Sequence, residues 1–232
     1  MPQKTSQKFS YIKKLFKPMM AVDILIFSIF ENKLKVLLVK RAIEPFRNAW
    51  AIPGGFIKEN ESLDQAALRE LKEETGVSTG YLEQLYTFGE PKRDPRGRVI
   101  STAYFALAPA SKTGTVIEHI DVSEARWFSI SNLPRLAFDH KKILNYALKR
   151  LQWKLEYTNI AYSILEDEFT LTELQKVYEI VFNKKFDKRN FRKKILSLNL
   201  VEPTGRMALK GVQRPAKTYR FLRKKLSFAE IT

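Results

Sequence analysis

One stretch of the sequence, residues 54–77, restricts the local fold more than any other. From Gly55 to Val77 it follows the pattern G-x5-E-x7-R-E-L-K-E-E-T-G-V. Ser62 and Gln65 have the spacing of a capping box, and Gly76 ends the periodic pattern, so we expect a helix between them. Glutamates that follow one another at three and four residues lie on one side of such a helix. The stretch therefore predicts a short helix that gathers carboxylates within about one turn.

The three clustered carboxylates belong to Glu70, Glu73 and Glu74. Like charges at that distance repel unless a cation lies among them. Hard oxygen ligands of this density suit Mg²⁺ or Mn²⁺, which commonly bridge protein carboxylates to substrate phosphates. The carbonyl of Gly54 is a further candidate ligand, because adjacent glycines let the backbone pass close to the metal.

Residues around the three glutamates decide between a site and an ordinary acidic surface. Most glutamate-rich helix faces are simply solvated. Here Gly55, Glu61 and Arg69 stand in register with the cluster, and Arg69 can brace it by pairing with Glu61 or with a ligand carboxylate. We therefore expect Glu61, Arg69, Glu70, Glu73 and Glu74 to form one metal-binding cluster.

Apolar runs elsewhere in the first 150 residues predict a sheet around this helix. Strands are expected at residues 20–30, 34–41, 81–88, 98–108 and 123–130, and a second helix at 139–154. Mixed strands with helices on their faces indicate an α/β sandwich. We expect the run at 19–30 to form a β-hairpin with the next apolar run rather than a signal peptide, because Asp23 interrupts it and a polar turn separates the two runs.

Composition bounds the class of protein. The 232 residues exceed the usual size of one domain, and the absence of cysteine excludes disulfides and thiolate chemistry. No stretch reaches the ~20 apolar residues that span a bilayer. We expect a cytoplasmic protein without a membrane partner, divided into a basic arm (1–18), a first domain (19–152) and a second domain (153–232).

The net charge of +16 is concentrated at the two ends of the chain. Residues 150–232 contain 18 basic and 9 acidic side chains, and the first 17 residues contain five lysines and no acid. This asymmetry is typical of proteins that contact phosphate backbones or anionic surfaces. A generally lysine-rich composition is the alternative.

The C-terminal region has the pattern of a winged helix-turn-helix. Helices are predicted at 163–167, 171–182 and 187–198, the last N-capped by Asp187, followed by two strands joined by a basic loop. The expected outward face of the third helix contains Lys188, Arg189, Asn190, Arg192 and Lys193, and the expected wing contains Arg206, Lys210, Arg214 and Lys217. These residues predict contacts with double-stranded DNA. A solvated charged helix, or a surface for an acidic protein, is the alternative.

The pattern of residues 55–77 fills every position of the Nudix box, so residues 20–150 resemble the Nudix hydrolase family. The resemblance implies that a metal-activated water attacks a diphosphate linkage. It makes Glu70, Glu73 and Glu74 the ligand candidates and gives Glu61 a bracing or general-base role.

Two further segments, GEPKRDPRGRVIS and LPRLAFDHKKIL, resemble the ADP-ribose-related branch of that family. They imply a nucleoside-diphosphate ligand such as ADP-ribose. Phe46 and Trp50 could stack on its base, although large aromatic residues are more often core. The expected substrate-binding residues are Arg41, Phe46, Arg93, Arg96 and Arg98.

The C-terminal segments FTLTELQKVYEIVF and FDKRNFRKKIL resemble the winged-helix domain of Nudix-related transcriptional regulators. Many of these regulators have a degraded Nudix box, whereas this one is intact. Two hypotheses follow: a regulator whose ADP-ribose-like effector is also hydrolysed, or a metabolic pyrophosphohydrolase with an accessory basic domain. Reading a two-fold operator would also require a homodimer.

Overall fold

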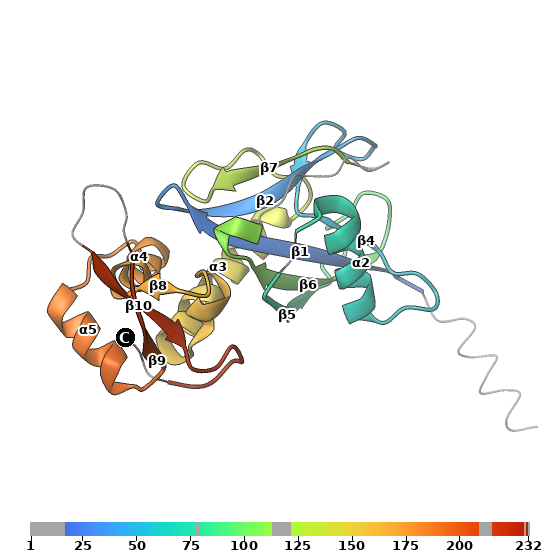
Figure 1. Ribbon diagram of the computed structural model, residues 1–232. Coiled ribbons are helices and arrows are strands. Elements are labelled where there is room, and N and C mark those ends of the chain that lie inside the picture. Colours follow the sequence, from blue (N-terminus) through green and yellow to red (C-terminus); the bar gives the residue numbers. More distant parts are fainter. Residues whose placement is uncertain (1–16, 78, 113–121, 209–214, 230, 232) are drawn as a thin grey trace, which may run out of the picture.

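A computed structural model describes residues 17–77, 79–112, 122–208, 215–229 and 231. The expected basic arm (1–18) lies almost entirely outside these residues. Within them the chain forms a larger N-terminal unit and a smaller C-terminal unit that contact each other (Figure 1).

The N-terminal unit is built on one mixed sheet. Its strands are β1 (Met19–Phe30), β2 (Lys33–Arg41), β3 (Trp50–Ala51), β4 (Gly54–Phe56), β5 (Tyr81–Phe88), β6 (Val99–Leu107) and β7 (Val122–Ser129). The sheet has the order β3-β2-β1-β6-β5, with β4 also paired to β1 and β7 to β2. Strands β1 and β6 are parallel, and the other pairs are antiparallel. The five strands expected from the sequence are confirmed.

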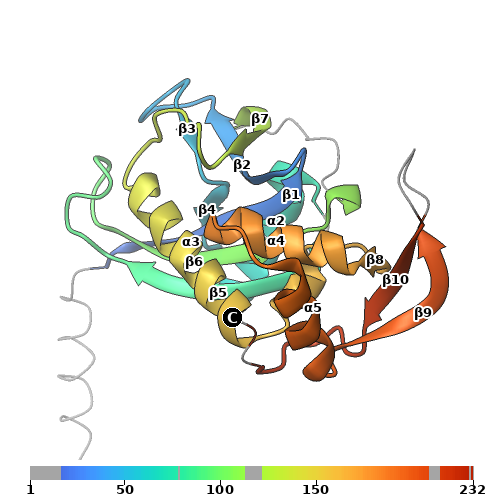
Figure 2. The same ribbon diagram turned by 90° about the vertical axis from the view of Figure 1, so that its left-hand side faces the viewer.

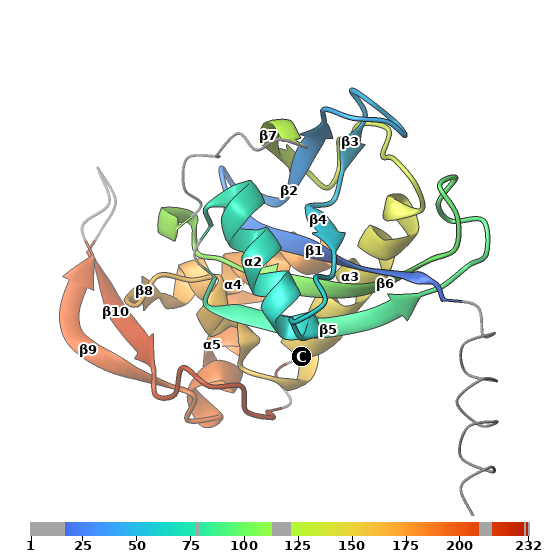
Figure 3. The ribbon, with the colours of Figure 1, turned by 90° about the vertical axis from the view of Figure 1, so that its right-hand side faces the viewer.

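Alternating residues of β1 supply both faces of this sheet. Ile24 and Ile26 belong to the core beneath helix α2 (Leu63–Thr75), whereas Leu25 and Phe27 belong to the core on the side of α3 (His140–Tyr157). Figure 3 shows α2 in front of the sheet with α3 behind it. The α/β sandwich predicted from the sequence is therefore confirmed, and α2 lies on a face of its own.

Helix α2 begins and ends where the sequence predicts. The Ser62 hydroxyl accepts from the amide of Gln65, while the Gln65 side chain accepts from the amide of Ser62, which completes the capping box. Gly76 ends the helix with φ of 60°, a left-handed conformation that glycine adopts without steric cost. These caps fix the register of the carboxylates on the helix.

The C-terminal unit is a winged helix. It contains η2 (Ile160–Ser163), β8 (Phe169–Thr170), α4 (Leu171–Phe182), α5 (Lys188–Ser197), β9 (Val201–Ala208) and β10 (Ala216–Phe221). A small sheet of order β8-β10-β9 forms the wing side. Asp187 caps α5 through the amide of Asn190, as predicted. The helix expected at 163–167 is wrong: a short 3-10 turn at 160–163 takes its place.

Helix α3 connects the two units. Ile143, Leu144, Leu151 and Leu155 on α3 share one continuous core with residues of β1 and of α4. The side chain of Gln152 also donates to the carbonyl of Val181 at 3.1 Å. Figure 2 shows α3 beside α4. The domain division expected at 152/153 falls inside this helix and stays a prediction.

No helix among the described residues is long and apolar enough to cross a membrane.

Candidate nucleotide site and nucleic-acid interface

One arginine organises the carboxylates of α2. Arg69 donates to both oxygens of Glu61, at 2.9 Å from Nε and 2.6 Å from Nη2. Its Nη1 donates to Glu70 at 2.6 Å and to Glu73 at 3.1 Å. Such bidentate and charge-assisted bonds hold rotamers that would otherwise spread apart. The bracing role expected for Arg69 is what the geometry provides.

The two glycines before the helix let the backbone approach these carboxylates. A Cβ on Gly55 would lie 2.1 Å from Oε1 of Glu70, and one on Gly54 would lie 2.1 Å from the carbonyl oxygen of Val22. The amide of Gly54 donates to Oε2 of Glu74 at 2.9 Å. A larger residue at Gly55 would displace the Glu70 carboxylate, and one at Gly54 would push β4 away from the backbone of β1.

The carboxylates differ in their electrostatic state. Burial raises the pKa of Glu70, although its bond with Arg69 opposes the change. The hydrogen bonds from Arg69 and from the amide of Lys58 lower the pKa of Glu61 to about 2. Glu61 is therefore held as an anion by its hydrogen bonds, whereas burial disfavours the charged form of Glu70.

The donor chemistry of this site fits a divalent cation. Glu70, Glu73, Glu74 and Gly54 line one cavity and offer only oxygen ligands from their side chains and carbonyl. Within the described residues, however, no three acidic or histidine side chains form a ready-made metal group. Arg69 holds Glu70 and Glu73, so these side chains would have to turn partly from Arg69 to bind a metal.

A second buried polar network lies on the other side of the same cavity. Arg93 is only 8% exposed and donates to Asp139 at 2.8 and 3.1 Å and to Asp23 at 3.3 Å. His140 accepts the amide of Ile52 through Nδ1 at 2.8 Å, and burial lowers its pKa. The network ties β1 to the start of α3.

Asp23 and Asp139 were not among the site residues expected from the sequence. Asp23 is an acid inside an otherwise apolar strand, and this interruption of the apolar pattern is the feature from which a buried polar role could have been predicted. Arg93 was expected to bind substrate; it lines the cavity, but its guanidinium is held by the two aspartates. Its substrate-binding role stays a prediction.

The cavity bounded by these groups has a volume of about 580 Å³. Arg41 and Arg96 line it as expected, together with Phe56 and Phe138, which the sequence did not single out. Phe46 lies beside the cavity, with its ring 4.8 Å from that of Phe138. Arg98 is not among the lining residues, so the geometry gives its expected role no support.

Exposed basic side chains lie on α5. Lys188, Arg189, Asn190 and Lys193 are exposed, whereas Phe191 and Ile195 are buried beneath them. Arg192 differs from the expected outward orientation: it is half-buried and donates to Thr172 Oγ1 at 3.1 Å. It connects α5 to the start of α4, and contact with DNA stays a prediction for it.

Two residues of the expected wing lie among the described residues. Arg206 on β9 is exposed and pairs with Glu168 at 2.8 Å, and Lys217 on β10 is exposed. Lys210 and Arg214 lie outside the described residues. Arg206 and Lys217 thus lie on the two strands of the wing, and Arg206 is already paired.

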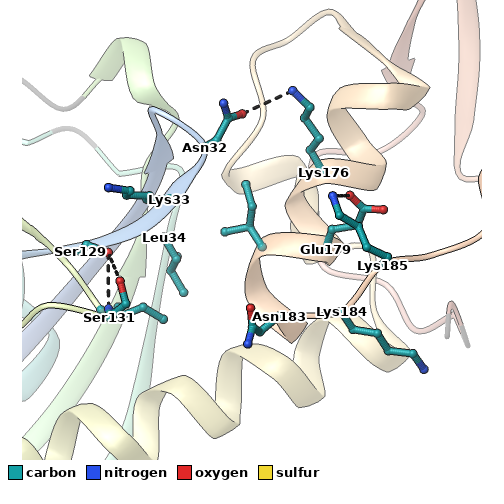
Figure 4. A pocket seen from close by; sticks show the side chains of 12 residues that line it. Asn32, Lys33, Leu34, Ser129, Ser131, Lys176, Glu179, Asn183, Lys184 and Lys185 are labelled. Atoms are coloured by element: carbon teal, nitrogen blue, oxygen red, sulfur yellow. Dashed lines mark hydrogen bonds and ion pairs between the residues drawn. The ribbon is translucent and has the colours of Figure 1, made fainter.

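A cavity of about 760 Å³ separates the β1–β2 hairpin from α4 (Figure 4). Leu34, Ile130 and Ile180 supply its apolar lining, and a hydrogen bond of 3.4 Å joins Lys176 to Asn32 across it. The two units are therefore closely packed along α3 and loosely packed along this hairpin.

Comparisons with known proteins agree with this division. Residues 19–147 match the NUDIX domain, and residues 161–221 match the NrtR DNA-binding winged helix domain. The chain is 39% identical over 208 residues to the ADPR responsive transcriptional repressor NtrR of Acinetobacter baylyi, covering 88% of this chain and 82% of the relative. It is 40% identical over 139 residues to an ADP-ribose pyrophosphatase of Methanocaldococcus jannaschii, covering 59% of this chain and 75% of the relative.

A solved structure has the same two units. The crystal structure of Shewanella oneidensis NrtR complexed with a 27mer DNA superposes with a TM-score of 0.79 at 36% identity, covering 87% of this chain and 93% of that chain. The superposition covers both units of this chain. It therefore includes the domain with the carboxylate helix and the basic winged helix. The chain belongs to the NrtR-type family of Nudix regulators, in which a Nudix domain is joined to a winged-helix DNA-binding domain.

Proposed function

We propose that this chain is a transcriptional regulator that binds double-stranded DNA through α5 and the wing, and binds ADP-ribose or a related nucleotide in the cavity beside α2. The observation that carries the proposal is the position of α3. His140 at its first turn lines the nucleotide cavity, and Leu151 and Leu155 near its last turn pack with α4. Helix α3 thus joins the nucleotide cavity to α4, and α4 in turn packs against α5.

A ligand can regulate DNA binding only if it binds two arrangements of the protein with different affinity. A nucleotide in the cavity would contact Phe138, which lies just before α3, and Arg93, whose guanidinium donates to the N-cap residue Asp139. A shift of the N-terminal end of α3 would change the position of α4, which packs against the C-terminal end of α3. The loose packing along the β1–β2 hairpin leaves room for such a shift.

The DNA-binding part of the proposal rests on α5 and on the DNA-bound relative. Exposed Lys188, Arg189 and Lys193 would contact phosphates or bases, and Arg206 and Lys217 would contact phosphates from the wing. Two copies of the chain would place two recognition helices on the half-sites of a two-fold operator.

Selection of duplexes from a random DNA pool tests this part. We expect the full chain to enrich a two-fold sequence and to keep its preference for that sequence between about 50 and 200 mM salt, where nonspecific contacts weaken. Binding that falls equally for all duplexes would contradict a regulatory role and support an accessory nucleic-acid surface.

Hydrolysis of the ligand is the second candidate function, favoured by the intact carboxylate set. When bound, magnesium would activate water and neutralise charge on the diphosphate. Glu70 and Glu73, turned partly from Arg69, would hold the cation with Glu74, Glu61 would keep Arg69 in place beside them, and Arg96 would face the phosphates.

Product release from ADP-ribose with and without Mg²⁺ tests the enzyme. Glu74→Gln is the informative variant, because its amide oxygen can still accept the Gly54 amide while the charge is lost. Turnover by the wild type that disappears in the variant would establish hydrolysis. Binding of ADP-ribose by the wild type without turnover would leave the cavity as a sensor only.

A further inference from the structure

A row of aromatic side chains lies on the solvent-facing side of α3. Tyr146, Trp153 and Tyr157 belong to the helix, and Trp153 is 48% exposed. Tyr86 of β5 stacks on Tyr146 with 5.0 Å between the ring centroids, and Phe228 stacks on Tyr157 at 6.3 Å. Figure 2 shows α3 in front of β5. We call these five residues the aromatic row.

The aromatic row leaves a large apolar surface in contact with water. Tyr86 is 52% exposed and Phe228 is 82% exposed, although burial of either ring would be favourable. Exposed charged side chains border the row on α3, among them Lys149 and Glu156. An apolar patch with a polar rim marks a protein–protein contact, and tyrosine and tryptophan are enriched in such contacts. The row is therefore the surface where we expect another protein chain to bind.

The spacing of the row along α3 fits a second helix. Positions 146, 150, 153 and 157 are four, three and four residues apart, which keeps them on one side of a helix and matches the seam of two paired helices. Arg150 occupies the seam position between Tyr146 and Trp153. The opposite side of α3 is already used, because Leu151 lies in the core of the chain. A partner helix therefore has to approach α3 from the solvent side.

The charges beside this seam favour a second copy of α3 in the antiparallel direction. Lys149 and Glu156 are seven residues apart, too far to pair within one helix, where ion pairs join residues three or four positions apart. Antiparallel pairing can set Tyr146 opposite the partner's Tyr157. In that register Lys149 lies beside the partner's Glu156, and the two-fold axis repeats the ion pair. Parallel pairing would instead bring Lys149 beside the partner's Lys154, where like charges repel.

We propose that this chain forms a dimer in which α3 of one copy pairs antiparallel with α3 of the other through the aromatic row. The inference rests on the proposed two-copy regulator and adds which surface joins the copies. In the same register Arg150 lies opposite the partner's Trp153, a cation–π contact, and Glu83 holds the Arg150 guanidinium at 2.7 Å. Because α3 also joins the nucleotide cavity to α4, the pairing connects the two nucleotide cavities through one pair of helices.

Sedimentation equilibrium of the full chain, without DNA or nucleotide, tests the pairing. We expect a dimer whose dissociation constant rises at least about tenfold in Lys149→Glu, because two opposite-charge contacts become like-charge contacts. Exchanging the charges in the double variant Lys149→Glu, Glu156→Lys should restore the dimer, since each copy again meets an opposite charge. Lys141→Glu is the matched control, because Lys141 is exposed on α3 outside the seam and should leave the dissociation constant unchanged.

Trp153→Glu removes the central ring of the row and should leave the chain monomeric. A wild type that is monomeric at about 100 μM would overturn the pairing. A dimer that survives both Lys149→Glu and Trp153→Glu would also overturn it, because another surface would then join the copies. Failure of the charge-exchanged variant to restore the dimer would overturn the antiparallel register. A dimer that responds to these variants as expected but selects no operator would contradict the proposed regulator and leave the pairing intact.

Discussion

Helices α2 and α5 both contain many charged side chains, but those of α2 pair within the chain, whereas those of α5 are exposed. On α2, Glu70 and Glu73 converge on Arg69, and Glu61 joins them from the preceding loop. On α5, Lys188, Arg189 and Lys193 point to solvent. Ion pairs hold the charged side chains of α2 in a fixed geometry, and those of α5 are exposed to a binding partner.

This difference corresponds to two kinds of ligand. A cation with a diphosphate needs several oxygens in one place, and the ion pairs of Arg69 keep the carboxylates gathered beside the cavity. A DNA backbone is a long array of charge, and mobile cations release its counterions without a fixed geometry. The comparison therefore predicts that a charge change on α2 affects stability, while one on α5 affects DNA binding.

The largest effect on stability should come from Arg69→Ala. Removing this guanidinium leaves three neighbouring carboxylates without a common partner, one of them buried, and should lower the free energy of unfolding by about 3 kcal/mol. Urea denaturation at neutral pH measures the loss. Lys193→Ala on α5 is the control and should change stability by less than about 0.5 kcal/mol. Similar losses in both variants would break the comparison.

The double variant Arg189→Glu and Lys193→Glu should lower operator affinity on the order of 100-fold, because two cations become like charges facing phosphate. Fluorescence anisotropy with a labelled duplex measures this change. Calorimetry should show unchanged binding of ADP-ribose. A parallel loss of ADP-ribose binding would mean that the two sites are not separable.

A smaller effect concerns the pH dependence of stability. The pKa of Glu61 is about 2 in the folded chain and 4.5 ordinarily, so its contribution is fully present above pH 4.5 and is lost as pH falls towards 2. Glu61→Gln should therefore destabilise the chain at pH 6 and much less at pH 2.5. Urea midpoints at the two pH values measure the difference. Equal destabilisation at both would contradict a paired Glu61 anion.

Sequence patterns predicted the local features of this molecule well. The capping box of Ser62 and Gln65, the stop at Gly76 and the cap at Asp187 each depend on residues four or fewer positions apart, so they can be recognised without the fold. The bracing of Glu61 by Arg69 also follows from spacing on one helix and the preceding loop.

Contacts between distant segments could not be predicted in this way. Arg93 joins Asp23 and Asp139, which lie 70 and 46 residues away in the chain, and only the folded sheet brings them together. Arg192 was expected to face outward from helical periodicity alone, but Thr172 on the neighbouring helix holds its guanidinium. Phe138 became visible as a lining residue only once the cavity was known.

Operator affinity of the full chain, measured with and without saturating ADP-ribose in metal-free buffer, tests the central claim most directly. If the nucleotide cavity and α4 are coupled through α3, ADP-ribose should change the dissociation constant for the duplex by at least about fivefold. The Arg189→Glu, Lys193→Glu variant should bind ADP-ribose normally yet show no operator complex to shift. An unchanged operator affinity at saturating ADP-ribose would contradict the account, because the nucleotide site and the DNA-binding site would then not be coupled.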